Sequence, residues 1–401
     1  MHSSIFESDC HETVTRLKSA LIELYDAGSV DPNKPQDAAR QLGVNKTLTW
    51  SISRFLESSG SMVAVSFAPG ASSIAKVVEA FPSTPKVMEA KARVHAAAAG
   101  VDAMIARHAG DRTTLDLILD NLTANPDDRL ELSRRLSFRG QSGICGVQAR
   151  TRLSTWFLAP NASDPTLLDM AAIRGCVRVR RLRPNVQWPI FKMRFWGFLD
   201  NTSEPNRWEP LDPAAPNGVP LMTEFCRGEI PHVDATTTEQ GRDYVMRSGE
   251  VGNTGAFDCF AGEIMRSEVG RYQTPQDQIG EVGMVISMPC ENIVIDLLYH
   301  RDLDFVSQAS SILFSEVIPH GQRTPSAEDS KVLPIHPRLT ALAGSPPAVA
   351  TPLVPRYSEM VQRAFERTGW TPSDFAGVRV ELEYPPLHSQ LMIRFPLPTA
   401  K

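Results

Sequence analysis

The stretch "PQDAARQLGVNKTLTWSISRFLES", residues 35–58, decides how the N-terminal part of this 401-residue chain folds. Two short helical patterns flank a break at Gly43, and glycine tolerates the positive φ that a tight turn between helices requires. Ala39 is a small residue four positions before that glycine, where one helix can cross another closely. Asn45 follows the break and is a good N-cap for the second helix. The sequence therefore predicts two helices joined by a short turn.

The second of these helices has two different faces. Leu48, Ile52, Phe55 and Leu56 recur at spacings of three and four, which is typical of a side that packs on a core. Lys and Arg can neutralise phosphates or read guanine, and Thr and Ser suit base edges or phosphates. We therefore predict DNA contacts from the complementary face, which carries Lys46, Thr47, Thr49, Trp50, Ser53 and Arg54.

The segment "AARQLGVNKTLTWSISRFL" (38–56) resembles the helix-turn-helix of bacterial transcriptional regulators, and the resemblance extends over about residues 9–58. It implies that residues 36–43 support, and residues 46–57 recognise, double-stranded DNA. Thr49 departs from the pattern, because such motifs commonly place an apolar residue there. The implied function is sequence-specific transcriptional regulation. A homodimer is expected, because two reading helices about one duplex turn apart multiply the contacts.

A purely structural role for the helix pair stays open. The first 60 residues carry 6 Lys/Arg and 8 Asp/Glu, a balance of −2. A DNA-binding domain is usually basic, since phosphate neutralisation supplies much of its affinity. Two short helices with this pattern could equally belong to the core of a helical domain.

Apolar periodicity predicts an α+β protein whose N-terminal part is helical. Helices are expected at 9–27, 71–81, 85–108, 112–122 and 126–138, with 61–70 a strand or a tight connection. Beyond residue 140, strands are expected within 148–160, 176–199, 254–265, 280–301 and 377–397, and helices at 164–175, 306–318 and 356–369. Residues 200–252 read as loop-like, and the Pro-rich segment 319–355 as a surface segment or linker.

Three regions follow from this pattern. A helix-turn-helix DNA-binding domain is expected at 1–62, a helical connector or dimerisation region at 63–139, and an α+β sensor or oligomerisation domain at 140–401. The alanine-rich helix at 85–108 is either the dimerisation or spacer element or an ordinary buried helix. A small-molecule effector would bind in the third region.

Charge is divided unevenly along the middle of the chain. Residues 134–199 carry 12 Lys/Arg and 2 Asp/Glu, whereas residues 200–304 carry 7 and 19. Such asymmetry indicates either an electrostatic surface for a partner, and hence a protein-interaction module, or two segments that neutralise each other across a sheet. The run "RVRRLR" is a candidate anion or nucleic-acid contact, or a charged edge strand; its arginines are Arg178, Arg180, Arg181 and Arg183.

No complete catalytic motif is present, so an enzyme is not expected. The sequence has no phosphate loop and no G-x-S-x-G elbow. The neighbourhoods of His232 with Asp234 and of His300 with Asp302 are the enzymatic alternatives. The six cysteines form no C-x-x-C pair, and no metal or cofactor is expected. With no apolar run of 18 residues and no secretory signal pattern, we expect a cytoplasmic protein away from the membrane.

Overall fold

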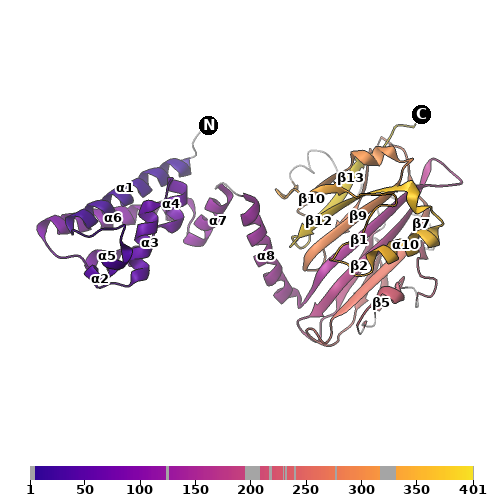
Figure 1. Ribbon diagram of the computed structural model, residues 1–401, viewed down its shortest axis with the longest axis horizontal. Helices are drawn as coiled ribbons and strands as arrows, with labels where there is room; N and C mark the ends of the chain where they lie inside the picture. Colours follow the sequence, from indigo (N-terminus) through magenta and orange to yellow (C-terminus); the bar gives the residue numbers. More distant parts are fainter. Residues whose placement is uncertain are drawn as a thin grey trace. The chain divides into compact units, whose positions relative to one another are not determined.

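The computed structural model describes residues 5–122, 126–194, 208–215, 219–228, 230, 233–238, 241–275, 278–316 and 331–400. The chain forms two compact units, residues 1–129 and 130–401. The first is helical and the second is built on mixed β-sheet with helices, so the predicted α+β class with a helical N-terminal region is confirmed (Figure 1).

The described helices of the N-terminal unit share one apolar core. Leu17 and Leu21 of the first helix are fully buried against the long sixth helix, where Val94 lies, and Phe55 joins the same cluster. These helices are α1 (Ile5–Ala27), α2 (Pro35–Leu42), α3 (Lys46–Glu57), α4 (Ser61–Phe67), α5 (Ala71–Glu79), α6 (Pro85–His108) and α7 (Arg112–Leu122).

Two predictions about this unit need correction. Residues 61–70, expected as a strand or a connection, contain α4, because a short apolar run does not by itself distinguish helix from strand. The predicted boundary between residues 62 and 63 is not a boundary between compact units, since the core continues through α7. The predicted limits of α6 are confirmed, and one apolar side of it, with Val87, Val94, Val101 and Met104, is buried in this unit.

A seven-stranded mixed sheet forms the middle of the C-terminal unit. Its strand order is β11-β12-β9-β1-β2-β7-β4, with β1 and β9 parallel and the other neighbours antiparallel. The strands are β1 (Val147–Pro160), β2 (Leu167–Arg181), β4 (Trp208–Pro210), β7 (Phe257–Gly270), β9 (Cys290–His300), β11 (Leu339–Ala341) and β12 (Phe375–Glu383).

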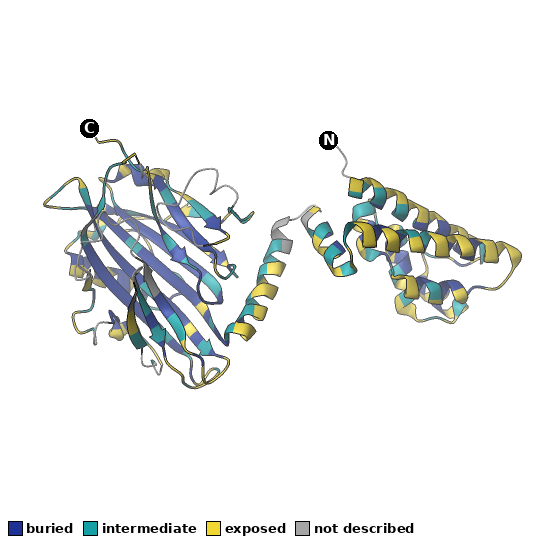
Figure 2. Ribbon diagram, turned by 180° about the vertical axis from the view of Figure 1, so that it is seen from behind, coloured by how far each residue is buried: buried dark blue, intermediate teal, exposed yellow. Residues whose placement is uncertain are grey.

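Both faces of this sheet are covered, and its long central strands are buried (Figure 2). Helix α10 (Tyr357–Thr368) packs on one face, where Phe365 meets Phe157 edge-on at a centroid distance of 5.4 Å. Two three-stranded sheets pack on the other face. Their strands are β3 (Trp188–Arg194), β6 (Gly241–Met246) and β5 (Val233–Thr238), then β10 (Ser310–Phe314), β13 (Gln390–Pro396) and β8 (Ile279–Val285).

Shorter elements complete the unit. Helix α8 (Pro126–Cys145) leads into β1, and Phe138 on it packs against Tyr384 at the end of β12. Single 3-10 turns occur at η1 (Thr223–Phe225), η2 (Asp304–Gln308) and η3 (Pro372–Asp374).

Several predicted elements in this unit were wrong. Residues 164–175, expected as a helix, lie largely in β2, where Ala171, Ala172 and Ile173 are all fully buried. A strand buried on both faces loses the alternation that identifies strands in a sequence. The helix expected at 306–318 is η2 followed by β10. The loop-like region 200–252 contains β4, β5 and β6, while residues 319–330 of the Pro-rich segment lie outside the described residues.

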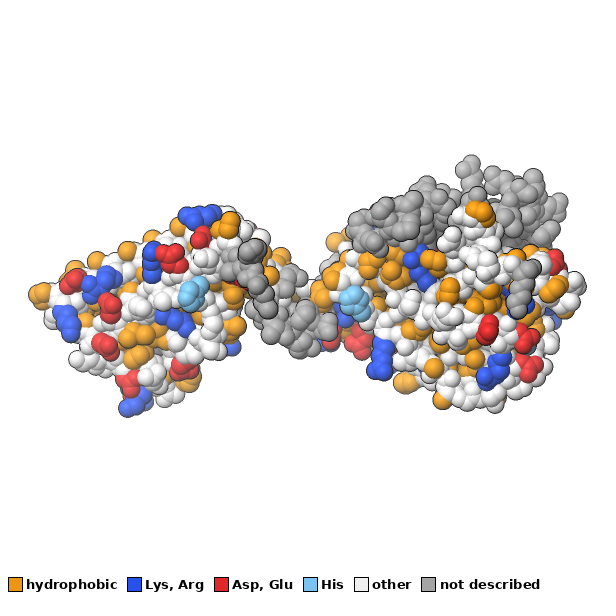
Figure 3. All heavy atoms as spheres, turned by 90° about the horizontal axis from the view of Figure 1, so that it is seen from above, with side chains coloured by type: hydrophobic (Ala, Val, Ile, Leu, Met, Phe, Trp, Pro, Cys, Tyr) orange, Lys and Arg blue, Asp and Glu red, His pale blue; other side chains and the backbone are white. Residues whose placement is uncertain are grey.

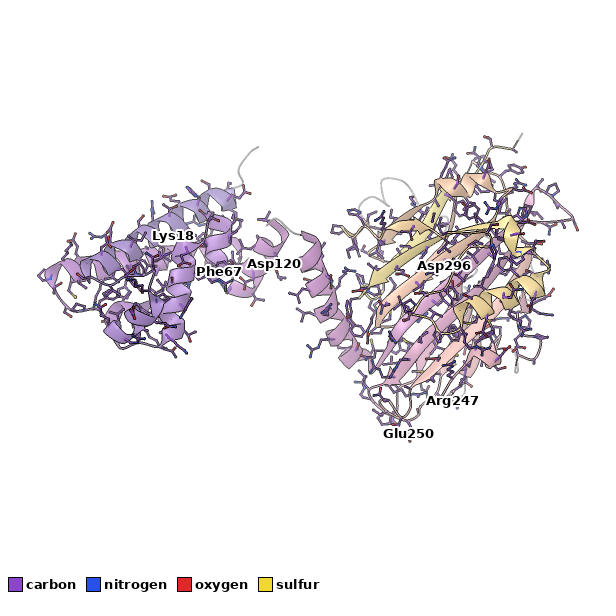
Figure 4. All side chains as sticks on the ribbon, viewed as in Figure 1. Lys18, Phe67, Asp120, Arg247, Glu250 and Asp296 are labelled. Carbon is purple, nitrogen blue, oxygen red and sulfur yellow. The ribbon has the colours of Figure 1, made fainter. Side chains whose placement is uncertain are left out.

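A buried network of charged and polar side chains connects the seven-stranded sheet to helix α10. Arg379 donates from Nε and Nη2 to the two carboxylate oxygens of Asp296, each at 2.7 Å. The Tyr357 hydroxyl donates to Asp296 Oδ2 at 2.8 Å and lies 2.7 Å from Thr155 Oγ1. Asp296 is fully buried in the middle of the sheet (Figure 4). The network therefore ties β9, β12, β1 and the start of α10 together.

We expect Arg379→Met to lower the free energy of unfolding of the C-terminal unit by about 3–5 kcal/mol, because it leaves a buried carboxylate without its cation. Urea unfolding of the full chain measures this. The matched control is Arg363→Met, which breaks an exposed pair with Glu224 and should cost less than about 1 kcal/mol. Equal losses in the two variants would contradict a special role for the buried pair.

Candidate functional site

The turn between α2 and α3 has the geometry that its sequence predicts. Gly43 ends α2 in the left-handed region, at φ 65° and ψ 28°, and its N–H donates to the Ala39 carbonyl. Asn45 then caps α3, because its side-chain oxygen accepts the N–H of Thr47 at 2.9 Å. The predicted roles of Gly43 and Asn45 are confirmed, and together they fix the direction in which α3 leaves the turn.

The inner face of α3 is held on the core of the N-terminal unit. Ile52 and Phe55 are buried in the same apolar cluster as Ala38 of α2. At the far end of the helix, Lys18 of α1 donates to the carbonyl oxygens of Leu56 at 3.3 Å and Ser58 at 2.6 Å (Lys18 is labelled in Figure 4). Helix α3 is thus restrained at its start, along its inner face and at its end.

Four of the six predicted contact residues lie on the outer face of α3. Lys46, Thr47, Trp50 and Arg54 are exposed, with 52% of Trp50 accessible. Within the described part of the chain Lys46 has no ion-pair partner. The Arg54 guanidinium has none either, and lies 4.0 Å from the centre of the Phe67 ring. The exposed face therefore carries two cations that no neighbouring carboxylate neutralises.

The other two predicted contacts, Thr49 and Ser53, were wrong. They are 2% and 3% exposed, because they follow the same side of the helix as Ile52. The Thr49 hydroxyl donates to the Pro35 carbonyl at 2.7 Å, which fastens α3 to the first residue of α2. The Ser53 hydroxyl donates to Glu57 at 3.0 Å. The Thr49 hydrogen bond explains how a polar residue occupies a position where helix-turn-helix motifs usually have an apolar one.

Charges elsewhere in this unit are largely balanced. On α2, Arg40 pairs with Asp37 at 3.2 Å, and Lys34 pairs with Asp31 at 3.8 Å before it. Basic and acidic side chains are interspersed over the face of this unit seen in Figure 3. That face presents no broad basic field, so its attraction for polyanions is confined to small areas.

The four arginines of residues 178–183 do not form one basic surface. Arg181 is buried and donates to the Arg247 carbonyl at 2.7 Å, so its predicted role in an anion or nucleic-acid contact is wrong. Arg178 lies at a bulge in β2 with φ 51°, where its own N–H donates to Asp258. Arg180 pairs with Glu291 at 3.4 Å, and Arg183 donates to the Ile144 carbonyl at 2.8 Å. The bulge at Arg178 interrupts the regular alternation of side chains along β2, and a shared anion site would need these arginines on one side of the strand.

The charge-divided segments neutralise each other in the sheet. Arg174 on β2 pairs with Glu263 on β7 at 3.1 Å, and Arg180 on β2 pairs with Glu291 on β9 at 3.4 Å. The alternative of mutual neutralisation across a sheet is confirmed for these pairs.

His300 and Asp234, which belong to the two enzymatic alternatives, make structural contacts. His300 ends β9, where Nδ1 accepts the Asp302 N–H at 3.2 Å and the ring meets Phe375 edge-on. Asp234 is paired with Arg247 at 2.8 Å, and His232 lies outside the described residues. Among the residues that the structure covers, no three metal-ligating side chains come together. All six cysteines are free thiols.

No single described helix is long and apolar enough to cross a bilayer, although α4 and α5, bent by 75° at their junction, pass such a test together. No protein-family model and no curated protein matches the sequence. A solved structure that does match is the "crystal structure of a putative protease from Parabacteroides distasonis ATCC 8503", with 6% identity and a TM-score of 0.29. The match covers 62% of this chain and 40% of that one.

Sequence reasoning missed a polar cluster between the seven-stranded sheet and the small sheets. Glu263 is 3% exposed, with Arg174 at 3.1 Å and the Tyr244 hydroxyl at 3.5 Å. The Arg174 guanidinium also lies 5.1 Å from the centre of the Trp156 ring. Burial raises the pKa of Glu263 to about 7, against the opposing effect of Arg174. Only the cross-strand register brings these residues together, and it is not readable from sequence.

We expect the stability of the C-terminal unit to carry a pH dependence from Glu263. The folded chain binds this proton more tightly than the unfolded chain, whose pKa is near 4.5. The contribution of Glu263 to the free energy of unfolding is therefore greatest below pH 4.5. It falls by on the order of 3 kcal/mol as the pH rises to about 7. Urea unfolding at stepped pH should show a flatter profile for Glu263→Gln than for wild type; identical profiles would contradict the raised pKa.

Proposed function

We propose that this protein is a DNA-binding transcriptional regulator that contacts double-stranded DNA through the outer face of α3. The observation that carries the proposal is the division of this helix into a fixed inner side and an exposed polar outer side. Lys46, Thr47, Trp50 and Arg54 share the outer side, while the caps and the core restrain the helix itself. A restrained helix can present side chains to a groove in one orientation.

The spacing of the exposed residues suits a groove. Lys46, Trp50 and Arg54 follow one another at intervals of four, so the two cations are separated by about 12 Å along the helix axis. That is about the width of the major groove, and cations at both ends can reach phosphates. Between them, Thr47 offers a hydroxyl to a base edge, and Trp50 offers an indole N–H and an apolar ring surface.

The low net charge of the N-terminal unit limits the electrostatic contribution to its DNA affinity. With Lys46 and Arg54 as the cations on this face, one copy neutralises few phosphates. A homodimer doubles that number and adds the specificity of two half-sites. Binding should therefore depend on assembly and decline only moderately with salt.

Helix α8 supports a dimer better than α6 does. Val87, Val94, Val101 and Met104 of α6 lie in the core of its own unit, although Met88 is 50% exposed, whereas α8 exposes three large apolar side chains. These are Leu132, Leu136 and Ile144, at 56%, 58% and 73%. These residues follow intervals of four and eight and so share one side of the helix. Under this proposal two α8 helices pair, and the C-terminal unit senses an effector or strengthens the assembly.

We expect Lys46→Ala/Arg54→Ala to weaken binding to DNA from upstream of the protein's own gene by about tenfold or more, as loss of two charged contacts requires. A gel-shift titration measures this. The control is Arg16→Ala/Lys86→Ala, which removes the same charge from exposed positions on α1 and α6. Equal binding by wild type and the α3 variant, or equal loss in both double variants, would refute recognition by α3.

We expect Leu132→Gln/Leu136→Gln to shift the protein from dimer to monomer, because two polar amides replace the apolar stripe of α8. Light scattering coupled to size exclusion gives the mass directly. Leu117→Gln, which alters an exposed leucine on α7, is the control and should leave the mass unchanged. A wild-type protein that is monomeric at every concentration would contradict this pairing.

A further inference from the structure

Arg152 of β1 is buried without a counter-charge. It is 6% exposed, and its Nε and Nη1 atoms have no hydrogen-bond partner. Among the described residues it has no ion-pair partner either. A buried ion that is left unpaired costs several kcal/mol, so proteins pair such groups or supply a ligand. Arg379 on the other face of the same sheet has a carboxylate held by two hydrogen bonds. Arg152 has the burial of Arg379 but not its partner.

The groups nearest to Arg152 do not supply the missing charge. Cross-strand register places it opposite Cys176 of β2 and Ile293 of β9, both in the core between the large sheet and the small sheets. Burial raises the pKa of Cys176, and it raises that of nearby Cys290 to about 12, so both thiols stay protonated and neutral. The next carboxylate along β9, Glu291, is paired with Arg180.

A row of polar side chains leads from Arg152 along the same face of β1. Residues two apart on a strand point to one side, which aligns Arg152 with Ser154 and Trp156. Ser154 is 2% exposed and lies opposite Arg174. Trp156 is only half-buried, and 14% of the Arg174 side chain is accessible. The row is therefore buried at Arg152 and Ser154 and partly accessible at Trp156.

The one buried carboxylate near this row is already engaged. Arg174 pairs with Glu263, and Arg242 lies close enough to Glu263 to lower its pKa as well. Among the described residues, Glu263 is therefore not left to pair with Arg152.

We propose that Arg152 and Ser154 bind the carboxylate of a small organic acid whose apolar body packs beside Trp156. The donor set distinguishes this from phosphate, because one guanidinium and one hydroxyl are too few to replace the hydration of a doubly charged group. The surrounding thiol, aliphatic and aromatic side chains suit an apolar body. The site belongs to the C-terminal unit and does not depend on DNA binding by α3.

The test uses the full chain and measures its melting temperature with added ligands. The probes are straight-chain acids from acetate to decanoate and aromatic acids such as benzoate, with the matched uncharged amides and inorganic phosphate for comparison. We expect one or more of the acids to raise the Tm by about 2–4 °C at saturation, and neither their amides nor phosphate to do so. Stabilisation by phosphate alone, equal stabilisation by acids and amides, or none by any probe overturns the proposal.

The matching variant is Arg152→Met, which replaces the unpaired cation with an apolar side chain of similar length. We expect its Tm without ligand to equal or exceed that of wild type, and its response to the acids to disappear. Arg150→Met, at an exposed position on the same strand, should behave as wild type in both measurements. A stable Arg152→Met protein that still responds to the acids excludes Arg152 as the binding group. A large drop in Tm without ligand shows instead that the arginine is already satisfied, and equally overturns the proposal.

Discussion

The seven-stranded sheet is covered on both faces, and that burial governs what every charged residue in its middle can do. Water does not reach the central strands, so a charge there needs a partner within the fold. Asp296 has such partners in Arg379 and Tyr357, and Glu263 has one in Arg174. Arg152 departs from this rule, because it is buried and has no such partner among the described residues. The uneven distribution of charge along the chain thus resolves in part into cross-strand pairs, and among the described residues Arg152 has none.

The N-terminal unit distributes its polar groups by a different rule. Its helices are amphipathic, so charged side chains can remain at the surface and the core needs few polar partners. The polar groups that are buried in α3 serve to position it: the Thr49 hydroxyl fastens the helix to α2, and Asn45 caps its first turn. The result is a short helix whose exposed residues are set by its neighbours. That restraint is the physical basis for treating the outer face as a recognition surface.

Much of this architecture could be predicted from local patterns, and the errors have identifiable causes. The limits of α6 and the roles of Gly43 and Asn45 follow from periodicity and from turn and cap chemistry, all of which act over a few residues. The first part of β2, residues 167–175, was expected as a helix because burial on both faces removes its alternation, whereas its end at 176–181 was expected as a strand. The face on which Thr49 and Ser53 lie depends on how α3 rotates against its core, which no single helix encodes. The bulge at Arg178 and the isolation of Arg152 arise from pairing between strands that are distant in sequence.

The parallel pairing of β1 with β9 has a consequence for synthesis on the ribosome. These neighbours are separated by more than a hundred residues of chain, and β12, which supplies Arg379, emerges later still. The helical unit has all of its core residues well before then and can fold while translation continues. A nascent chain that has reached β9 carries Asp296 before Arg379, its partner in the folded unit, has been synthesised. The edge of β9 that pairs with β12 therefore stays unpaired until β12 has been synthesised.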